Sequence, residues 1–275
     1  TEVAWLLQRS LAARLGADGK PVPLVAETGG QNAMVVDSSA LAEQVVADAL
    51  SSAFDSAGQR CSALRVLCVQ RDVADRLFDM LEGALAELRV GDPRALAVDV
   101  GPVIDEEARA GIEAHLERMR ARGHRIVRPT AADPSVPGCY VAPAIVEIGS
   151  LAELQREVFG PVLHMLRYER DALDALLGQI NATGYALTLG VHTRIDETVA
   201  RVVGAARAGN VYVNRNMVGA VVGVQPFGGE GLSGTGPKAG GPHYLYRFCA
   251  EQTLTVNTAA AGGNVELLAG LGSRS

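Results

Sequence analysis

The spacing of apolar residues along the chain predicts alternating helices and strands. Apolar side chains recur at the spacing of one helix face over residues 1–15, 40–56, 72–88, 171–181 and 195–207. Short apolar runs typical of buried strands lie at residues 22–26, 33–36, 64–69, 162–167, 187–193 and 211–214. Strands and helices alternate most regularly after residue 162, which is typical of a parallel sheet flanked by helices. We therefore predict an α/β fold.

Weaker signals fill the gaps in this pattern. Residues 105–121 are rich in Arg and Glu and predict a helix with a solvated face. Ser38 or Ser39 is the expected N-cap of the helix that begins near residue 40. Further strands are expected at 124–128 and 140–148, and a short helix at 151–157. A β-like segment at 251–257 precedes a tail rich in Gly and Ala, so we expect it to be the last regular element.

Composition narrows the class of protein. The 275 residues suffice for one large or two ordinary domains, and 48% hydrophobic with 20% charged residues exclude a disordered chain. A net charge of −6 gives no basic field, so nucleic acid and anionic membranes are not expected partners. Charges interrupt every apolar stretch before the ~20 residues of a membrane span, and the start lacks a secretory signal. We expect a cytoplasmic protein.

The cysteines point to one reactive thiol rather than to a metal site. Cys61, Cys68, Cys139 and Cys249 form no CxxC pair, and no His lies at zinc-finger spacing, so no metal is expected. Free thiols are expected in a reducing compartment. Cys68 lies in an apolar run and is a core residue by that pattern, whereas Cys61 lies in a small polar loop, residues 55–62, between a helix and a strand. Such a loop is where an accessible nucleophile is placed.

A glycine pattern imitates a dinucleotide-binding fingerprint. Gly229, Gly231 and Gly234 have the G-x-G-x-x-G spacing, but Pro and Gly residues follow them and cannot open a helix. We therefore reject a Rossmann role for this loop. Two interpretations stay open: exposed N–H groups that hold a small anion, and close backbone packing.

Glu27 and Cys61 form a workable pair for chemistry on a carbonyl group. Each follows a predicted strand or helix, and each is flanked by small residues. A thiolate attacks the carbonyl carbon, and a carboxylate then activates water against the thioester. Taken alone, however, an isolated Glu is most often solvated and an isolated Cys most often packs in the core.

Four segments, taken together in sequence order, favour the catalytic interpretation of Glu27 and Cys61. They are residues 27–32 (ETGGQN), 58–62 (GQRCS), 157–162 (EVFGPV), and 210–214 (NVYVN) leading to 226–229 (PFGG). Together they resemble the aldehyde dehydrogenase superfamily over nearly the whole chain. Residues 219–229, 233–244 and 253–264 are similar, more finely, to the bifunctional proline utilization A family, in its L-glutamate γ-semialdehyde dehydrogenase module.

The resemblance implies a role for each matching residue. Cys61 is implied as the nucleophile and Glu27 as the general base of thioester hydrolysis. Glu157 is implied to hold the nicotinamide ribose hydroxyls, Phe159 to pack beside the nicotinamide, and Gly29 to belong to the cofactor site. The implied reaction is the NAD-dependent oxidation of L-glutamate γ-semialdehyde to L-glutamate. FAD is implied only for a proline dehydrogenase part of a longer parent protein.

The substrate carboxylate is implied to meet a second group of residues. Ser62, beside the nucleophile, and the loop Ser233, Gly234 and Thr235 supply hydroxyl and N–H donors that suit a carboxylate. This assignment also accounts for the glycines of the rejected fingerprint.

The resemblance implies a division of the chain and a departure from the family. We expect residues 1–36 to be a remnant of a Rossmann-type NAD-binding domain, 37–245 the catalytic domain, and 246–275 an oligomerisation strand and tail in a homo-oligomer. The first residue is Thr1 rather than Met and already has helical patterning, which indicates a fragment that starts inside a domain. Because much of the family's cofactor site precedes this point, including an oxyanion-hole asparagine, we expect the isolated chain to be a poor catalyst.

Two other hypotheses remain. The chain is alternatively a structural or assembly module of a larger protein, in which the catalytic residues are bystanders. A Cys–His hydrolase is the third reading, but the five histidines, His115, His124, His164, His192 and His243, lack a recognisable thiol-protease context.

Overall fold

The computed structural model describes residues 1–129 and 137–257, and it confirms an α/β fold. Its α-helices are α1 (Glu2–Ala12), α2 (Ala42–Phe54), α3 (Arg71–Ala86), α4 (Glu106–Ala121), α5 (Leu173–Ala182) and α6 (Asp196–Ala205). Its strands are β1 (Ala33–Val36), β2 (Val66–Gln70), β3 (Ile126–Val127), β4 (Ala144–Ile148), β5 (Val162–Tyr168), β6 (Tyr185–Ala186), β7 (Thr188–His192), β8 (Asn210–Val213) and β9 (Glu230–Gly231). Short 3₁₀ turns are η1 (Asp55–Gly58), η2 (Leu151–Glu153), η3 (Arg170–Ala172) and η4 (Leu245–Phe248).

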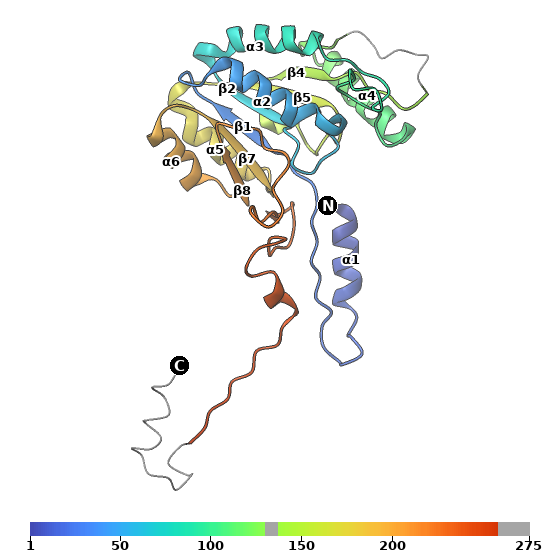
Figure 1. Cartoon of the computed structure of the whole chain (residues 1–275), viewed down its shortest axis with the longest axis vertical. Helices are drawn as coiled ribbons and strands as arrows, with labels where there is room; N and C mark the ends of the chain where they lie inside the picture. The colour runs from blue at the N-terminus through green and yellow to red at the C-terminus, as the bar shows by residue number, and fades with distance from the viewer. Residues whose placement is uncertain (130–136, 258–275) are drawn as a thin grey trace.

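The core is a seven-stranded sheet with the order β3-β4-β5-β2-β1-β7-β8. Only the edge strand β3 is antiparallel; the other neighbours pair in parallel. Figure 1 shows α2 and α3 together along the sheet, and α5 and α6 beside β7 and β8. Every residue of β1, β2 and β7 is buried, as expected for parallel strands covered on both faces.

Strand β1 corrects one expected boundary. It lies between β2 and β7, with Ala33 opposite Val66 on one side and Leu189 on the other. We assigned these residues to the N-terminal remnant, but they form a middle strand of the main sheet. The sheet-bearing unit therefore begins before residue 33, and the remaining division into domains stays a proposal.

Of the two elements expected at the N-terminus, the helix at residues 1–15 forms as α1 and the strand does not. Helix α1 buries no residue and stands away from the sheet (Figure 1). The strand expected at residues 22–26 does not form, because no strand among the described residues pairs with it; a bridge joins the next residue, Glu27, to Gly234. An apolar run predicts burial, but a strand also requires a hydrogen-bonded partner.

The expected caps and C-terminal strand also need revision. Helix α2 begins after Leu41 without a side-chain cap, because the Ser39 hydroxyl donates to Asp37 at 2.6 Å instead. Residues 251–257 are extended but pair with no strand within the described part of the chain. Residues 258–275 of the predicted tail lie outside the described residues, so the oligomerisation strand stays a prediction.

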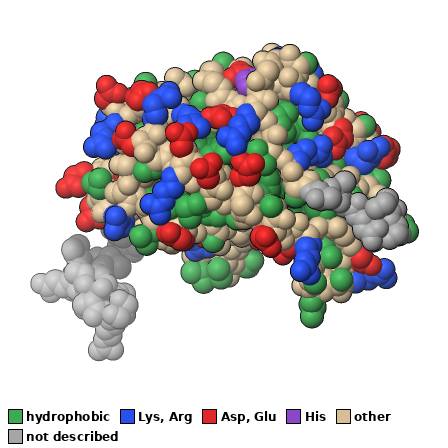
Figure 2. Space-filling model, turned by 90° about the horizontal axis from the view of Figure 1, so that it is seen from above, with side chains coloured by type: hydrophobic (Ala, Val, Ile, Leu, Met, Phe, Trp, Pro, Cys, Tyr) green, Lys and Arg blue, Asp and Glu red, His purple; other side chains and the backbone are tan. Residues whose placement is uncertain are grey.

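The surface mixes charges of both signs. Figure 2 shows acidic and basic side chains interspersed on the face seen from above. Ion pairs such as Arg125–Glu82 at 2.7 Å connect them. Among the described helices, none combines the length and apolarity needed to cross a membrane.

Candidate active site

Cys61 lies in a tight loop between α2 and β2, as the sequence predicts. Ser56, Ala57 and Gly58 are all left-handed, with φ of 56°, 54° and 65°. This conformation disfavours side chains, and a Cβ on Gly58 would overlap the Gly160 carbonyl group. The loop therefore turns sharply against the segment before β5 and leaves Cys61 half-buried at its end.

The buried side chain of Asn32 anchors the backbone of this loop. Its side-chain amide donates to the carbonyl oxygens of Cys61 at 2.7 Å and Ala63 at 2.9 Å, and its Oδ1 accepts from the Thr188 N–H at 3.2 Å. Asn32 is 2% exposed. A buried amide with all these partners satisfied fixes the backbone on which the thiol is mounted.

Arg65 is a site residue that the sequence analysis did not single out. Its guanidinium group, 1% exposed, donates to the backbone carbonyls of Gly58 (2.7 Å), Arg60 (3.1 Å) and Gly160 (3.2 Å). It also donates to Oε1 of Glu157 through Nε at 3.2 Å and Nη2 at 2.9 Å. The available signal was a lone charge inside the apolar run Leu64–Val69.

Glu157 faces this cluster from the segment before β5. Arg65 holds its Oε1, and the Gly30 N–H donates to its Oε2 at 3.2 Å. A Cβ on Gly29 would overlap Oε2, so glycine at this position makes room for the carboxylate. Burial raises the pKa of Glu157, and the neighbouring Arg65 opposes that rise.

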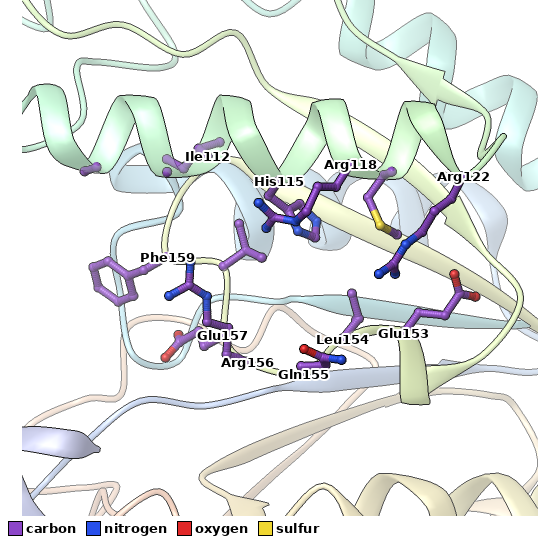
Figure 3. A pocket seen from close by; sticks show the side chains of 14 residues that line it. Ile112, His115, Arg118, Arg122, Glu153, Leu154, Gln155, Arg156, Glu157 and Phe159 are labelled. Carbon is purple, nitrogen blue, oxygen red and sulfur yellow. The ribbon is translucent and has the colours of Figure 1, made fainter.

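A cavity of about 470 Å³ opens beside Glu157 and Phe159 (Figure 3). One wall is α4 and the other is the segment from Glu153 to Phe159. Phe159 is 46% exposed, and its ring centre lies 5.2 Å from the Arg65 guanidinium carbon. The cavity thus presents a carboxylate and an aromatic ring beside open space. This combination suits a nucleoside ligand.

Three arginines outnumber the two carboxylates, Glu153 and Glu157, in the lining of the same cavity. Arg118, Arg122 and Arg156 line it, and none of them forms an ion pair with another described residue. Burial first, and then the charges of these three arginines, lower the pKa of His115, deeper in the wall, to about 4. An anionic ligand is therefore favoured here.

His115 and His164 pair with each other rather than with Cys61. His115 Nε2 and His164 Nε2 lie 2.9 Å apart, and His164 Nδ1 lies 3.0 Å from the Arg65 carbonyl oxygen. Since a carbonyl oxygen only accepts, His164 donates from Nδ1 and accepts from His115. Both rings are buried and occupied with each other, which gives the Cys–His hydrolase hypothesis no support.

Glu27 is held against the glycine-rich loop. The Thr28 N–H donates to the Ser233 carbonyl at 3.1 Å, and the Thr235 N–H donates to the Ala26 carbonyl at 3.0 Å. An added Cβ on Gly234 would lie 3.6 Å from the Glu27 carboxylate. The loop therefore packs closely, as one of the two open interpretations requires, and burial raises the pKa of Glu27.

The other predicted substrate residues have different degrees of access. Ser233 is fully buried, and its Oγ accepts from the Ala186 N–H at 3.0 Å, so in this chain its hydroxyl supports the loop. Ser62 is 7% exposed, whereas Thr235 is exposed. Contact of these residues, and of Gly234, with a substrate carboxylate stays a prediction.

Electrostatics place the thiol and the two carboxylates in one cluster. Burial raises the pKa of Cys61, the charges of Glu157 and Glu27 raise it further, and the Ser62 N–H lowers it. Together these effects favour the protonated form of the thiol. Within residues 1–129 and 137–257, no group of His, Cys, Asp and Glu is arranged to hold a metal ion.

Asn210 organises the remaining motif. Its side chain donates to the Pro226 carbonyl at 2.9 Å and accepts from the Gly228 N–H at 3.3 Å. A Cβ on Gly228 would lie 2.8 Å from Glu27 Oε1. The segments 27–32, 58–62, 157–162 and 226–229 thus surround one site, although they are far apart in sequence.

Comparisons with known proteins agree with this arrangement. The aldehyde dehydrogenase family model matches residues 8–254. The bifunctional protein PutA of Escherichia coli K12 is 64% identical over 267 residues, which cover 94% of this chain and 20% of that protein. The chain therefore spans about a fifth of the length of this curated relative.

Solved structures show the same similarity. A crystal structure of a bifunctional proline utilization A protein matches with a TM-score of 0.88 and 57% identity, over 95% of this chain and 26% of that one. A 1-pyrroline-5-carboxylate dehydrogenase from Thermus with bound NAD matches with a TM-score of 0.81 and 31% identity. The match covers 90% of this chain and 47% of the Thermus protein.

Proposed function

The chain belongs to the aldehyde dehydrogenase family, and on that premise we propose that it oxidises L-glutamate γ-semialdehyde to L-glutamate with NAD as the hydride acceptor. One observation carries the proposal: Arg65 bonds both the loop before the half-buried Cys61 and the Glu157 carboxylate, and Glu157 also accepts from the Gly30 N–H in the segment that carries Glu27. The names of the relatives support the substrate, because 1-pyrroline-5-carboxylate is the cyclic imine of that semialdehyde.

Cys61 begins the reaction. After loss of its proton, the thiolate attacks the aldehyde carbon and forms a thiohemiacetal. The Ser62 N–H, which favours the thiolate, lies at the reacting sulfur. Asn32 and Arg65 keep the surrounding carbonyl groups in place, so the sulfur is presented from a rigid backbone.

The chain's residues fit a nicotinamide cofactor. Glu157 Oε2 accepts only a 3.2 Å bond from Gly30, which leaves lone pairs for ribose hydroxyls. Phe159 exposes its ring to the same cavity, and the three arginines favour an anionic dinucleotide. NAD, when bound, supplies the acceptor for the hydride that leaves the thiohemiacetal carbon. A bound NAD in the Thermus relative supports this choice.

Glu27 completes the reaction by activating water. Its carboxylate takes a proton from a water molecule as the oxygen attacks the thioester carbonyl, and the Cys61 sulfur leaves with glutamate released. Burial moves the pKa of Glu27 upward, toward neutrality, which makes it a stronger base while it is still ionised. Ser62, Gly234 and Thr235 are proposed to hold the substrate's α-carboxylate, as their donors suit an anion.

Assembly with a second copy is proposed separately. Leu254 and Val256, in the extended C-terminal segment, are 83% and 67% exposed. Exposed apolar side chains such as these favour contact with another chain. Sedimentation of a Leu254→Asp, Val256→Asp variant tests this: a smaller assembly is expected, and an unchanged one contradicts it.

NADH formation in the protein that carries this chain tests the proposed function. With L-glutamate γ-semialdehyde and NAD, we expect turnover in the wild type and at least a ~10³-fold loss in Cys61→Ala. Cys249→Ala is the matched control, because that thiol is exposed and distant in the C-terminal segment. Retained activity in Cys61→Ala would refute the assignment of the nucleophile.

A further inference from the structure

One buried guanidinium group ties together three separate segments of the site. All N–H donors of Arg65 are used: on the loop before Cys61 through the Gly58 and Arg60 carbonyls, on Gly160 before β5, and on Glu157. The Glu157 and Gly160 partners lie 92 and 95 residues from Arg65 in sequence. A change at Arg65 therefore reaches the nucleophile loop and the cofactor carboxylate together.

The ion pair between Arg65 and Glu157 also reconciles two opposing electrostatic requirements of the site. Glu157 is needed as an anion to hold ribose hydroxyls, but its negative charge raises the pKa of the Cys61 thiol. Arg65 is 1% exposed and Glu157 12%, so each charge is costly without the other. The positive charge of Arg65 offsets the negative charge of Glu157. The same guanidinium group also interacts electrostatically with the Cys61 thiolate.

We propose that Arg65 is a positioning residue that couples the Cys61 loop to the cofactor-binding carboxylate of Glu157 and screens the thiol from that carboxylate. The cofactor part rests on the proposed function, whereas the effect on the thiol does not. Lys is a poor substitute here, because an ammonium group cannot reproduce the planar fork that serves Glu157 and the backbone carbonyls at once.

The reactivity of the thiol separates positioning from mere structural support. Iodoacetamide alkylation is followed from pH 7 to 10 in the protein that carries this chain, by mass spectrometry of the tryptic peptide beginning at Cys61. In Arg65→Met the profile is expected to shift to higher pH by about one unit, a tenfold lower rate near pH 7.5. In Glu157→Gln it is expected to shift the other way, and in the double variant to return toward wild type.

Arg65→Lys and Arg167→Met complete the design. Arg65→Lys keeps the charge, so its alkylation profile is expected to stay within about twofold of wild type while the KM for NAD rises about tenfold and kcat changes less. Arg167, which pairs with Glu147 and Asp75, is the matched control. Arg167→Met is expected to lower stability without moving the alkylation profile.

Two results would overturn the inference. An alkylation profile unchanged in Arg65→Met and in Glu157→Gln would reduce Arg65 to structural support. If Arg65→Met fails to fold, an unchanged KM for NAD in Arg65→Lys would do the same. Absence of NADH formation in the wild type would instead refute the proposed function, because alkylation requires neither NAD nor aldehyde.

Discussion

Gly29→Ala tests the link between the glycine motif and Glu157. An added Cβ would overlap Oε2 of Glu157 and lie 3.1 Å from its Cδ, whereas carbon atoms in contact need about 3.5–4.0 Å. The carboxylate must therefore rotate or withdraw. Movement weakens its bond from the Gly30 N–H, at 3.2 Å, and its bonds from Arg65, at 2.9 and 3.2 Å.

The size of the effect follows from the bond that a displaced Glu157 carboxylate no longer makes to a ribose hydroxyl. A hydrogen bond to a charged group contributes about 1.5–3 kcal/mol, so its loss predicts an affinity for NAD that is weaker by about 10- to 150-fold. Calorimetric titration of NAD into the protein measures this directly. Because Cys61 is not touched, kcat at saturating NAD is expected to fall less than the affinity.

Gly83→Ala is the matched control. Gly83 lies in α3, and an added Cβ meets no atom within 4 Å. Its affinity for NAD is expected to equal that of the wild type, with a gain in stability of about 0.5–1 kcal/mol from the helix propensity of Ala. Unchanged NAD affinity in Gly29→Ala would refute the reasoning that Glu157 contacts the cofactor from this position.

Three further predictions concern buried polar groups. Asn32→Ala leaves two carbonyl oxygens of the Cys61 loop without their hydrogen-bond donor. The variant is therefore expected to lower the free energy of unfolding by about 1–3 kcal/mol and to lower kcat. Stability and turnover equal to the wild type, in denaturation and NADH assays, would contradict this. Ser233→Ala is expected to lower the unfolding free energy by a similar ~1–3 kcal/mol, because the hydroxyl is a buried acceptor, whereas a raised KM for the semialdehyde with unchanged stability would favour direct substrate binding. Burial lowers the pKa of His115 to about 4 and of His164 to about 3, so both stay neutral in the folded state while the unfolded chain binds protons below pH ~6.5. The stability that these two neutral histidines provide is thus lost as pH falls from about 6.5 toward 4, and near pH 5 the free energy of unfolding falls by roughly 2–3 kcal/mol per pH unit. Urea unfolding across this range should show a steeper decline in the wild type than in a His115→Leu, His164→Leu variant. Equal slopes in the two proteins would contradict this.

Much of the fold was predictable because helices are encoded by local periodicity. The helix expected at residues 105–121 is α4 (Glu106–Ala121), and the strand expected at 64–69 is β2 (Val66–Gln70). Strands fail where pairing decides. Residues 22–26 have the apolar pattern of a strand, but no neighbour offers them a ladder of hydrogen bonds.

The sequence predicted site residues only where the residue type and its motif together indicate a chemical role. Cys61 and Glu157 were predicted from their motifs, and in the structure Arg65 bonds both Glu157 and the loop before Cys61. Arg65 was missed because Glu157 and Gly160, the partners that tie it to a second segment, lie 92 and 95 residues away, so its apolar neighbours gave no sign of them. At Ser233 the structure adds a partner that the sequence could not show, because its buried hydroxyl accepts from the Ala186 N–H, while its contact with a substrate stays a prediction.

The central claim is that Cys61 carries the acyl group and Glu27 releases it, and single-turnover analysis of Glu27→Gln tests it most directly. The variant is mixed with L-glutamate γ-semialdehyde and NAD, and NADH is measured together with the mass of the tryptic peptide that begins at Cys61. The account predicts a burst of about one NADH per site, little further turnover, and a glutamyl thioester on Cys61. Steady turnover at the wild-type rate, or a burst that leaves Cys61 unmodified, would contradict it.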